Sequence, residues 1–193
     1  MAKATTEFQY PASLQEYAID AAAYLRQHVE YDVMCTGVVV FNKDGKLLLV
    51  QRAADEKAFP NMWEIPGGKI DDTDETLLHA AVRELNEETG LTATRVRRKV
   101  ADFTFEDGRP GGPTVTWLKL IFEVEVEDLD VTLNPAEHQQ YLFASEEEVV
   151  SDLVGDTKLV YISPPNKRIK LDAFRLQKEA ITGSSCTTRP TQL

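Results

Sequence analysis

Residues 67 to 91 read GGKIDDTDETLLHAAVRELNEETGL, and they carry the strongest structural and chemical signal in the chain. Apolar residues recur here at helical spacing, namely Leu77, Leu78, Ala81, Val82 and Leu85. This spacing predicts an amphipathic helix with one face turned toward a core. We expect Asp72 and Glu75 to form a capping box at the start of the helix and Gly90 to end it.

Acidic side chains crowd the second half of this helix. Glu84, Glu87 and Glu88 span roughly 100° of its surface, and Glu88 projects at the edge of the apolar stripe. Clustered carboxylates repel one another unless a cation lies among them, and hard oxygen ligands suit Mg²⁺ or Mn²⁺, whose usual partners are phosphates. The alternative is a solvated acidic face in which Arg83 pairs with Glu87. That alternative does not explain acids at the seam between helix and core, so a metal site is the preferred interpretation.

The same stretch resembles the signature box of the Nudix hydrolases, the MutT-like superfamily that cleaves nucleoside diphosphates linked to another group. The family pattern is a Gly, five residues, a Glu, seven residues, then Arg-Glu-apolar-x-Glu-Glu-x-Gly-apolar, and the chain matches it from Glu75 onward. Upstream, six residues separate Gly68 from Glu75. Asp74 would restore the first spacing but break the second, so we interpret the difference as a one-residue loop insertion. The preceding WEIPGGK, residues 63–69, is similar to a segment of MutT-like members.

The resemblance implies a fold, a cofactor and a set of ligands. The fold would be an α/β/α sandwich with a mixed sheet, to which this chain adds an N-terminal helix. Glu84, Glu87 and Glu88 would hold Mg²⁺ (or Mn²⁺), with the Gly67 carbonyl as a further candidate ligand. Arg83 would orient a neighbouring glutamate without touching the substrate.

Hydrolysis also requires a general base, because the attacking water must lose a proton. In the family this base is a box glutamate or a glutamate on a later loop. The candidates here are Glu84 and Glu137, the latter in NPAEHQQYLFASEEEV at residues 134–149. The alternative for Glu137 is a capping or surface acid, and His138 is interpreted as a loop histidine outside the chemistry.

Basic and aromatic residues near the box are candidates for substrate contacts. Arg52 and Lys69 would offset the charge of a polyphosphate, unless they only form ion pairs with the surrounding acids. Trp63 is a candidate for stacking on a base, as are Phe59 and Trp117, and the alternative for each is a place in the core.

The expected activity is divalent-metal-dependent hydrolysis of a diphosphate linkage in a small nucleoside di- or triphosphate-type substrate. The SQPWPFPxS pattern of NADH-type members is missing, and Phe105 stands where many ADP-ribose hydrolases carry a proline. Two alternatives stay open. One is hydrolysis of a non-nucleotide isoprenoid diphosphate, with the N-terminal helix lining an apolar pocket. The other is a non-catalytic ligand-binding Nudix module, against which the intact acids weigh.

Composition narrows the class of protein further. The chain has 193 residues and a net charge of −11, which argues against a nucleic-acid polymer as partner. Its two cysteines, Cys35 and Cys186, are too few and too far apart for a disulfide framework or a zinc site. There is no apolar run long enough for a membrane span and no signal sequence, so we expect a cytoplasmic monomer or homodimer.

The order of elements agrees with one catalytic domain. We expect an N-terminal helical extension over residues 1–31, with a capping box at Ser13 and Glu16, then a Nudix domain over 32–182 and a disordered tail over 183–193. Strands are predicted at 33–41, 46–52, 96–105, 115–126 and 141–144, and further helices at 145–153 and 166–181. The loop EDGRPGGPT, residues 106–114, is expected to be mobile and to reach the pocket.

Overall fold

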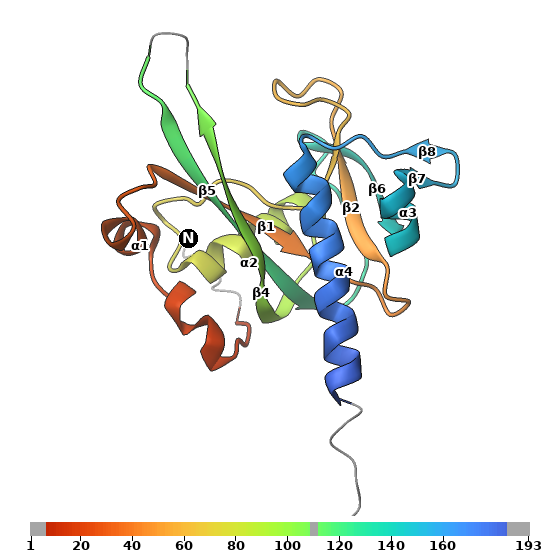
Figure 1. The fold of residues 1–193 in the computed structure, drawn as a ribbon, viewed down its shortest axis with the longest axis horizontal. Helices are drawn as coiled ribbons and strands as arrows, with labels where there is room; N and C mark the ends of the chain where they lie inside the picture. Colours follow the sequence, from red (N-terminus) through yellow and green to blue (C-terminus); the bar gives the residue numbers. More distant parts are fainter. Residues whose placement is uncertain (1–6, 109–111, 185–193) are drawn as a thin grey trace, which may run out of the picture.

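The computed structural model describes residues 7–108 and 112–184, which form the mixed α+β sandwich that the sequence predicts (Figure 1). The helices are a 3-10 helix η1 (Ala12–Tyr17), α1 (Ala21–Gln27), α2 (Leu77–Thr89), α3 (Glu146–Ser151) and α4 (Pro164–Ser184). The strands are β1 (Val33–Val39), β2 (Leu47–Arg52), β3 (Trp63–Glu64), β4 (Ala93–Asp107), β5 (Val115–Val126), β6 (His138–Ala144), β7 (Leu153–Val154) and β8 (Thr157–Lys158).

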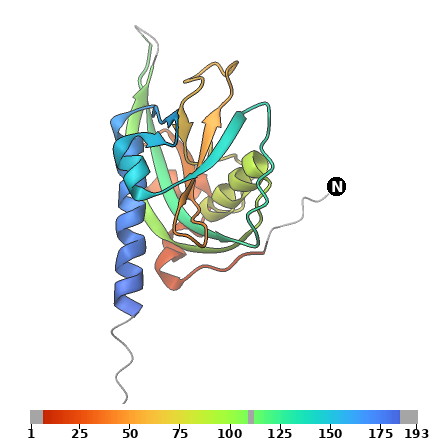
Figure 2. The same cartoon turned by 90° about the vertical axis from the view of Figure 1, so that its right-hand side faces the viewer.

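Two sheets lie at the centre of the molecule. The first has the order β1-β5-β4, with β1 parallel to β5 and β5 antiparallel to β4. The second has the order β3-β2-β6 and is antiparallel. The predicted strands at 33–41 and 46–52 are confirmed, but they belong to different sheets and meet only near their shared turn, where Phe41 bridges Leu47. The predicted pair β4 and β5 forms a long hairpin that projects from the body (Figures 1 and 2).

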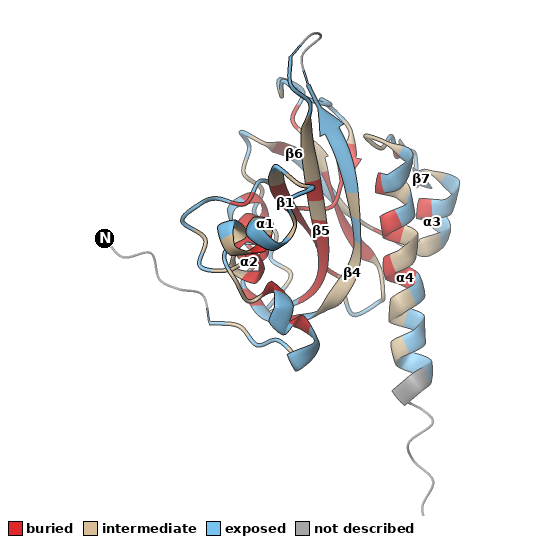
Figure 3. Cartoon of the chain, turned by 60° about the vertical axis from the view of Figure 1, so that its left-hand side comes forward, coloured by how far each residue is buried: buried red, intermediate tan, exposed pale blue. Residues whose placement is uncertain are grey.

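Alternating side chains of the central strands fill two cores. Figure 3 shows the buried residues gathered on β1, β5 and α2. On β5, Leu118, Leu120 and Phe122 face α2 and the N-terminal segment, whereas Ile121 faces the second sheet and α4. This is the expected two-residue period of a strand buried on both faces. Helices therefore cover opposite sides of the sheets, as in an α/β/α arrangement.

The predicted N-terminal helix is wrong in form, because the segment contains two short helices. Ser13 and Glu16 form no capping box, since η1 begins after Pro11 without a side-chain cap. The chain then turns, and α1 starts again with Asp20 as its N-cap. Buried Leu14 joins the core around α2, so the extension is packed into the domain.

Helix α2 begins later than predicted. Its N-cap is Thr76, whose hydroxyl accepts the His79 N–H at 3.2 Å. Asp72 and Glu75 lie before the helix and do not cap it. The first backbone N–H of the helix, on Leu77, instead donates to the Ile19 carbonyl at 2.9 Å. The break between η1 and α1 thus places a carbonyl where the first turn of α2 needs an acceptor.

The later elements follow the sequence more closely. The strand near 141–144, the acidic helix and the final helix are confirmed as β6, α3 and α4. Residues 109–111 of the predicted mobile loop and 185–193 of the predicted tail lie outside the described residues, and α4 itself continues to Ser184. Among the described residues, no helix combines the length and the apolar character that a membrane crossing requires.

Candidate active site

The glycine-containing loop before α2 lies against β1. The Thr36 N–H donates to the Gly68 carbonyl at 2.8 Å, and the Val38 N–H donates to the Pro66 carbonyl at 2.7 Å. Gly67 has a φ of 138°, and a side chain there would clash with the Thr36 carbonyl oxygen. Only glycine fits this position, because both its backbone angle and its close approach exclude a Cβ atom.

Glu84 and Glu88 come from α2 to meet this loop, and both are buried. The Gly67 N–H donates to Glu88 Oε2 at 2.8 Å. Glu84 lies against Gly68, where an added Cβ would stand 2.5 Å from its Oε2 atom. The structure therefore brings together three of the predicted site residues, Gly67, Glu84 and Glu88.

These two carboxyl groups are held in an environment that disfavours their charge. Burial raises the pKa of Glu88 to about 7, and the Gly67 N–H and the charge of His138 only partly oppose this rise. Burial also raises the pKa of Glu84, with Arg83 opposing and the charges of Glu87 and Glu137 adding to the rise. Buried carboxylates with too little compensating charge are what a bound cation would relieve.

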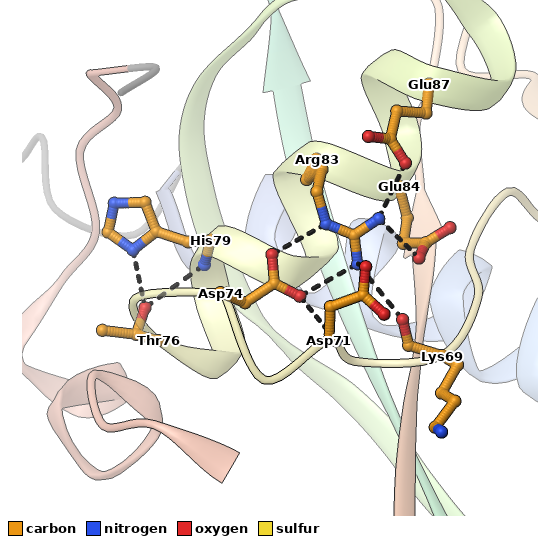
Figure 4. A network of polar contacts seen from close by, with 8 residues as sticks. All are labelled: Lys69, Asp71, Asp74, Thr76, His79, Arg83, Glu84 and Glu87. Carbon is orange, nitrogen blue, oxygen red and sulfur yellow. Dashed lines mark hydrogen bonds and ion pairs between the residues drawn. The ribbon is translucent and has the colours of Figure 1, made fainter. Parts of the chain in front are cut away.

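Arg83 is the hub of a charged network around the loop (Figure 4). Its Nη1 atom lies 2.9 Å from Glu84 Oε1 and 2.7 Å from Glu87 Oε2, and its Nη2 atom donates to the Lys69 carbonyl at 3.1 Å. The predicted pairing of Arg83 with Glu87 is present, as is the predicted contact with a neighbouring glutamate. Two acids of the loop complete the network: Asp74, and Asp71, which lies 3.9 Å from Arg83 Nη2.

Asp74 corrects our interpretation of the loop. It accepts from Arg83 Nε at 2.7 Å and from Nη2 at 2.9 Å, and its side chain is only 5% exposed. The Glu75 side chain is 70% exposed, and its Oε2 atom lies 3.8 Å from His79 Nε2. Asp74 therefore occupies the position beside the arginine, and the extra residue lies between it and α2. The signal was in the sequence, since Asp74 restores the spacing from Gly68.

A second buried network lies behind Glu88. Arg52 Nη1 is 2.7 Å from Glu64 Oε1, and His138 Nε2 is 3.6 Å from the same oxygen. Burial alone would raise the pKa of Glu64, but His138, Lys119 and Arg52 together lower it to about 2. Glu64 was visible in WEIPGGK, yet only its buried surroundings identify it as a charged anchor.

Two interpretations change because of this network. His138 is the first residue of β6 and is 1% exposed, so its assignment to a loop is wrong. Burial lowers the pKa of its imidazole, but Glu64 and Glu88 raise it overall. Arg52 also contacts Glu56 at 3.3 Å and donates to the Ala58 carbonyl at 2.8 Å, so it has the ion pairs of the alternative interpretation. A contact of Arg52 with phosphate stays a prediction.

The remaining candidates are placed less decisively. Glu137 accepts from Asn134 Nδ2 at 2.7 Å and is close enough to Glu84 to raise its pKa, so a role as base stays a prediction. Lys69 is exposed, and Figure 4 shows its side chain directed away from the Arg83 network. Trp63 is 1% exposed within the core and has no face for a base, which corrects its assignment as a substrate contact. Trp117 is half-buried and stacks on Phe105, with ring centroids 5.6 Å apart.

The donor set fits a hard divalent cation in chemistry but needs a local rearrangement. Across residues 7–108 and 112–184, no three His, Cys, Asp or Glu side chains are already arranged to hold one ion. Arg83 occupies oxygens of Glu84 and Glu87, and Gly67 occupies one of Glu88. Rotation of Glu84 and Glu87 from Arg83 would release carboxylate oxygens on one side of α2, which is the ligand type that Mg²⁺ prefers.

Comparison with known proteins agrees with this architecture. The NUDIX domain model matches residues 33–161. The RNA pyrophosphohydrolase of Novosphingobium aromaticivorans is 32% identical over 158 residues, covering 73% of this chain and 91% of the relative. The CTP pyrophosphohydrolase of Escherichia coli is 34% identical over 111 residues, covering 58% and 75%.

Solved structures give the same fold. The MutT protein from Methanosarcina mazei Go1 superimposes with a TM-score of 0.57 at 24% identity, covering 76% of this chain and 95% of that one. The family model spans the sheets, the glycine loop and α2, which are the elements that assemble the buried carboxylates. The chain therefore belongs to the Nudix family and is a Nudix hydrolase.

Proposed function

We propose that this enzyme hydrolyses a diphosphate linkage in a nucleoside di- or triphosphate-type substrate with the help of Mg²⁺ or Mn²⁺. The ligands in this proposal are Glu84, Glu87, Glu88 and the Gly67 carbonyl. The observation that carries it is the pair of buried carboxyl groups, Glu84 and Glu88, which meet at the glycine loop and whose pKa values burial raises.

The cation, when bound, would neutralise phosphate charge and acidify the attacking water. The protein residues have separate tasks around it. Before a cation binds, Arg83 keeps Glu84 and Glu87 close together through its contacts at 2.9 and 2.7 Å, and Asp74 would retain Arg83 when the two glutamates turn to the cation. The proton of the water passes to Glu84 or to Glu137. Glu137 has the easier access, because it is only partly buried and receives a single side-chain hydrogen bond.

The names of the relatives support a phosphorylated nucleotide as substrate. They include enzymes named for CTP and for RNA. Our proposal favours the small molecule, since the chain carries a net charge of −11, whereas binding along a nucleic-acid strand relies on basic surface. A triphosphorylated RNA end is the strongest competing substrate, and it belongs in the same test.

The isoprenoid alternative loses the observation that suggested it. It required a long N-terminal helix along an apolar pocket. The segment forms two short helices instead. Its Leu14 and Tyr17 side chains pack into the core around α2, so they do not line a ligand pocket. Geranyl diphosphate is therefore included in the test as the substrate expected to fail.

The deciding experiment is a substrate screen on wild type, Glu87→Gln and Glu88→Gln. The substrates are the common nucleoside triphosphates, an RNA oligonucleotide with a 5′-triphosphate, and geranyl diphosphate, with release of monophosphate and pyrophosphate measured. Loss of one metal ligand should remove several kcal/mol of transition-state stabilisation, which lowers kcat on the order of a hundredfold. Calorimetric titration with Mn²⁺ gives an independent readout, and each substitution should weaken binding.

Glu75→Gln is the matched control, because Glu75 is an exposed glutamate just outside α2 that makes one long contact. It should retain wild-type kcat and Mn²⁺ affinity. Equal turnover by wild type and both site variants, or turnover that persists in chelator, would remove the proposal.

A further inference from the structure

A lysine outside the carboxylate cluster, Lys119, has the properties of an anion-binding group. It lies on β5, where its register partners are Cys35 on β1 and Phe103 on β4. A Cβ atom placed on Gly37 would stand 3.1 Å from Lys119 Cε, so the lysine chain runs along the Gly37 backbone. Gly37 is small enough to let it pass.

Lys119 is half-buried, yet it has no hydrogen bond or ion pair with any residue in the described part of the chain. The neighbouring cations differ in this respect. Arg52 pairs with Glu64, and Arg83 pairs with Asp74, Glu84 and Glu87. A lysine that is partly removed from water without an anionic partner carries an unpaid desolvation cost, which a ligand can offset.

The local charge balance points in the same direction. Glu64 is the buried acid within electrostatic reach of Lys119, and it is already paired with Arg52 at 2.7 Å. Lys170, on α4, is fully buried nearby. Burial, with a smaller contribution from the charge of Lys119, lowers the pKa of Lys170 to about 7, although Glu64 opposes this change. Glu64 is therefore already engaged by Arg52, and it gives Lys119 no close ionic partner among the described residues.

Lys119 is also close to the predicted metal ligands. A Cβ atom on Gly67 would lie 2.7 Å from Gly37 Cα, so Gly37 lies between the glycine loop and the lysine chain. Cys35 reports on the same proximity. Burial raises the pKa of its thiol to about 11, Lys119 opposes this rise, and Glu84 and Glu64 add to it. Lys119 and Glu84 are thus both within electrostatic reach of the same buried thiol.

The surface beside Lys119 offers aromatic contacts for the rest of a ligand. Trp117 is two residues away on β5 and points to the same face, because side chains alternate along a strand. Phe105 stacks on Trp117, and Phe103 lies opposite Lys119. The indole Nε1 atom of Trp117 is buried and has no hydrogen-bond acceptor among residues 7–108 and 112–184.

We infer that Lys119 binds the polyphosphate of the substrate on the side opposite the α2 carboxylates. A phosphate between Lys119 and Glu84 would give Lys119 the anionic partner that it lacks. The bound Mg²⁺ or Mn²⁺ of the proposed function would offset the repulsion between this phosphate and the α2 carboxylates. The substrate's organic group then extends toward Trp117 and Phe105. The inference deepens the proposed function, because it rests on a substrate that carries adjoining phosphates.

Binding of inorganic pyrophosphate tests this directly. Wild type, Lys119→Met, Lys119→Gln and Lys119→Arg are titrated by calorimetry, once without divalent metal and once with MgCl₂. Loss of one charge-assisted contact should weaken pyrophosphate binding about tenfold in Lys119→Met and Lys119→Gln, and Lys119→Arg should restore most of it. Lys158→Met is the control, because Lys158 is an exposed lysine on β8.

Hydrolysis of CTP gives a second readout that a merely structural role would not move. Lys119→Met should raise KM about tenfold and leave kcat within about threefold, since a contact made equally in both states changes binding alone. Unfolding in urea should give wild-type stability for at least one of the two neutral variants.

The outcomes separate this inference from the proposed function. If pyrophosphate binding depends on Lys119 but no substrate is hydrolysed, the lysine site stands and the proposed function fails. If hydrolysis depends on Glu88 while both neutral variants bind pyrophosphate as wild type does, Lys119 is not the phosphate contact. Weakening of the same size in Lys158→Met, or no binding of pyrophosphate by wild type, also overturns the inference.

Discussion

Asp74→Asn is the sharpest test of how the glycine loop supports the site. Asp74 is 5% exposed and accepts two hydrogen bonds from Arg83, at 2.7 and 2.9 Å. Asparagine keeps one oxygen acceptor but loses the charge and the second acceptor. Loss of one charge-assisted hydrogen bond in a buried position costs about 2 kcal/mol. For a chain of this size, that lowers Tm by about 4–8 °C.

Glu75→Gln is the matched substitution one residue later. Glu75 is 70% exposed, and its one close partner in the described residues is His79 at 3.8 Å. An exposed pair at this distance contributes about 0.5 kcal/mol or less, so Tm should stay within about 2 °C of wild type. Thermal unfolding followed by circular dichroism measures both variants side by side.

The same pair also separates function from stability. Without Asp74, Arg83 is free to move toward Glu84 and Glu87, which it contacts at 2.9 and 2.7 Å. Mn²⁺ affinity should then fall about tenfold in Asp74→Asn, as expected for a group that orients metal ligands, and remain unchanged in Glu75→Gln. Equal Tm shifts in the two variants, or a larger shift in Glu75→Gln, would refute the assignment of Asp74 as the partner of Arg83.

Three further predictions concern buried groups. The pKa of Lys170 in the folded protein, about 7, lies below its ordinary value of 10.5, so the free energy of unfolding of wild type should rise by about 2–3 kcal/mol between pH 7 and pH 9. Lys170→Met lacks this titrating group, so any stability advantage of the variant over wild type should narrow by that amount in urea titrations. A gap that stays constant with pH would show that Lys170 is charged when buried. Gly68→Ala should lower kcat more than tenfold with about 1 kcal/mol lost in stability, since its Cβ would lie 2.5 Å from Glu84 Oε2 and displace that carboxylate; wild-type kinetics would contradict this. Trp63→Ala should cost about 3–5 kcal/mol in chemical denaturation, as for a large core side chain, and a loss below about 1 kcal/mol would mean that Trp63 is not packed as described.

The sequence predicted the elements that depend on local periodicity. Strands β1, β2, β4, β5 and β6 and helices α2, α3 and α4 were located, because alternating or helical apolar spacing reflects which face of each element is buried. The two-residue strands β3, β7 and β8 were not predicted, since they are too short to show such a period. The carboxylates of α2 were likewise predictable, since a helix fixes the relative directions of Glu84, Glu87 and Glu88.

Features that depend on distant partners were not predictable in this way. Asp72, Asp74 and Thr76 are all residue types that cap helices. In the structure the Asp74 side chain binds Arg83, and Thr76 is the N-cap. The break after η1 depends on the bond from Leu77 to the Ile19 carbonyl. The sequence around Lys119 could not show that this lysine has no ion-pair partner among the described residues. Its neighbours in space come from β1, β3 and α4, which are distant in the sequence.

The hydrogen bond from Leu77 to Ile19 has a consequence for where this enzyme can be cut. The family match begins at residue 33, so a chain trimmed to that boundary would leave the first peptide N–H of α2 without its acceptor and expose the apolar surface that Leu14 and Tyr17 cover. The segment needed for folding therefore begins before the family match does. If α2 binds the cation as we propose, a protease that removes η1 and α1 would loosen the start of that helix and lower the activity.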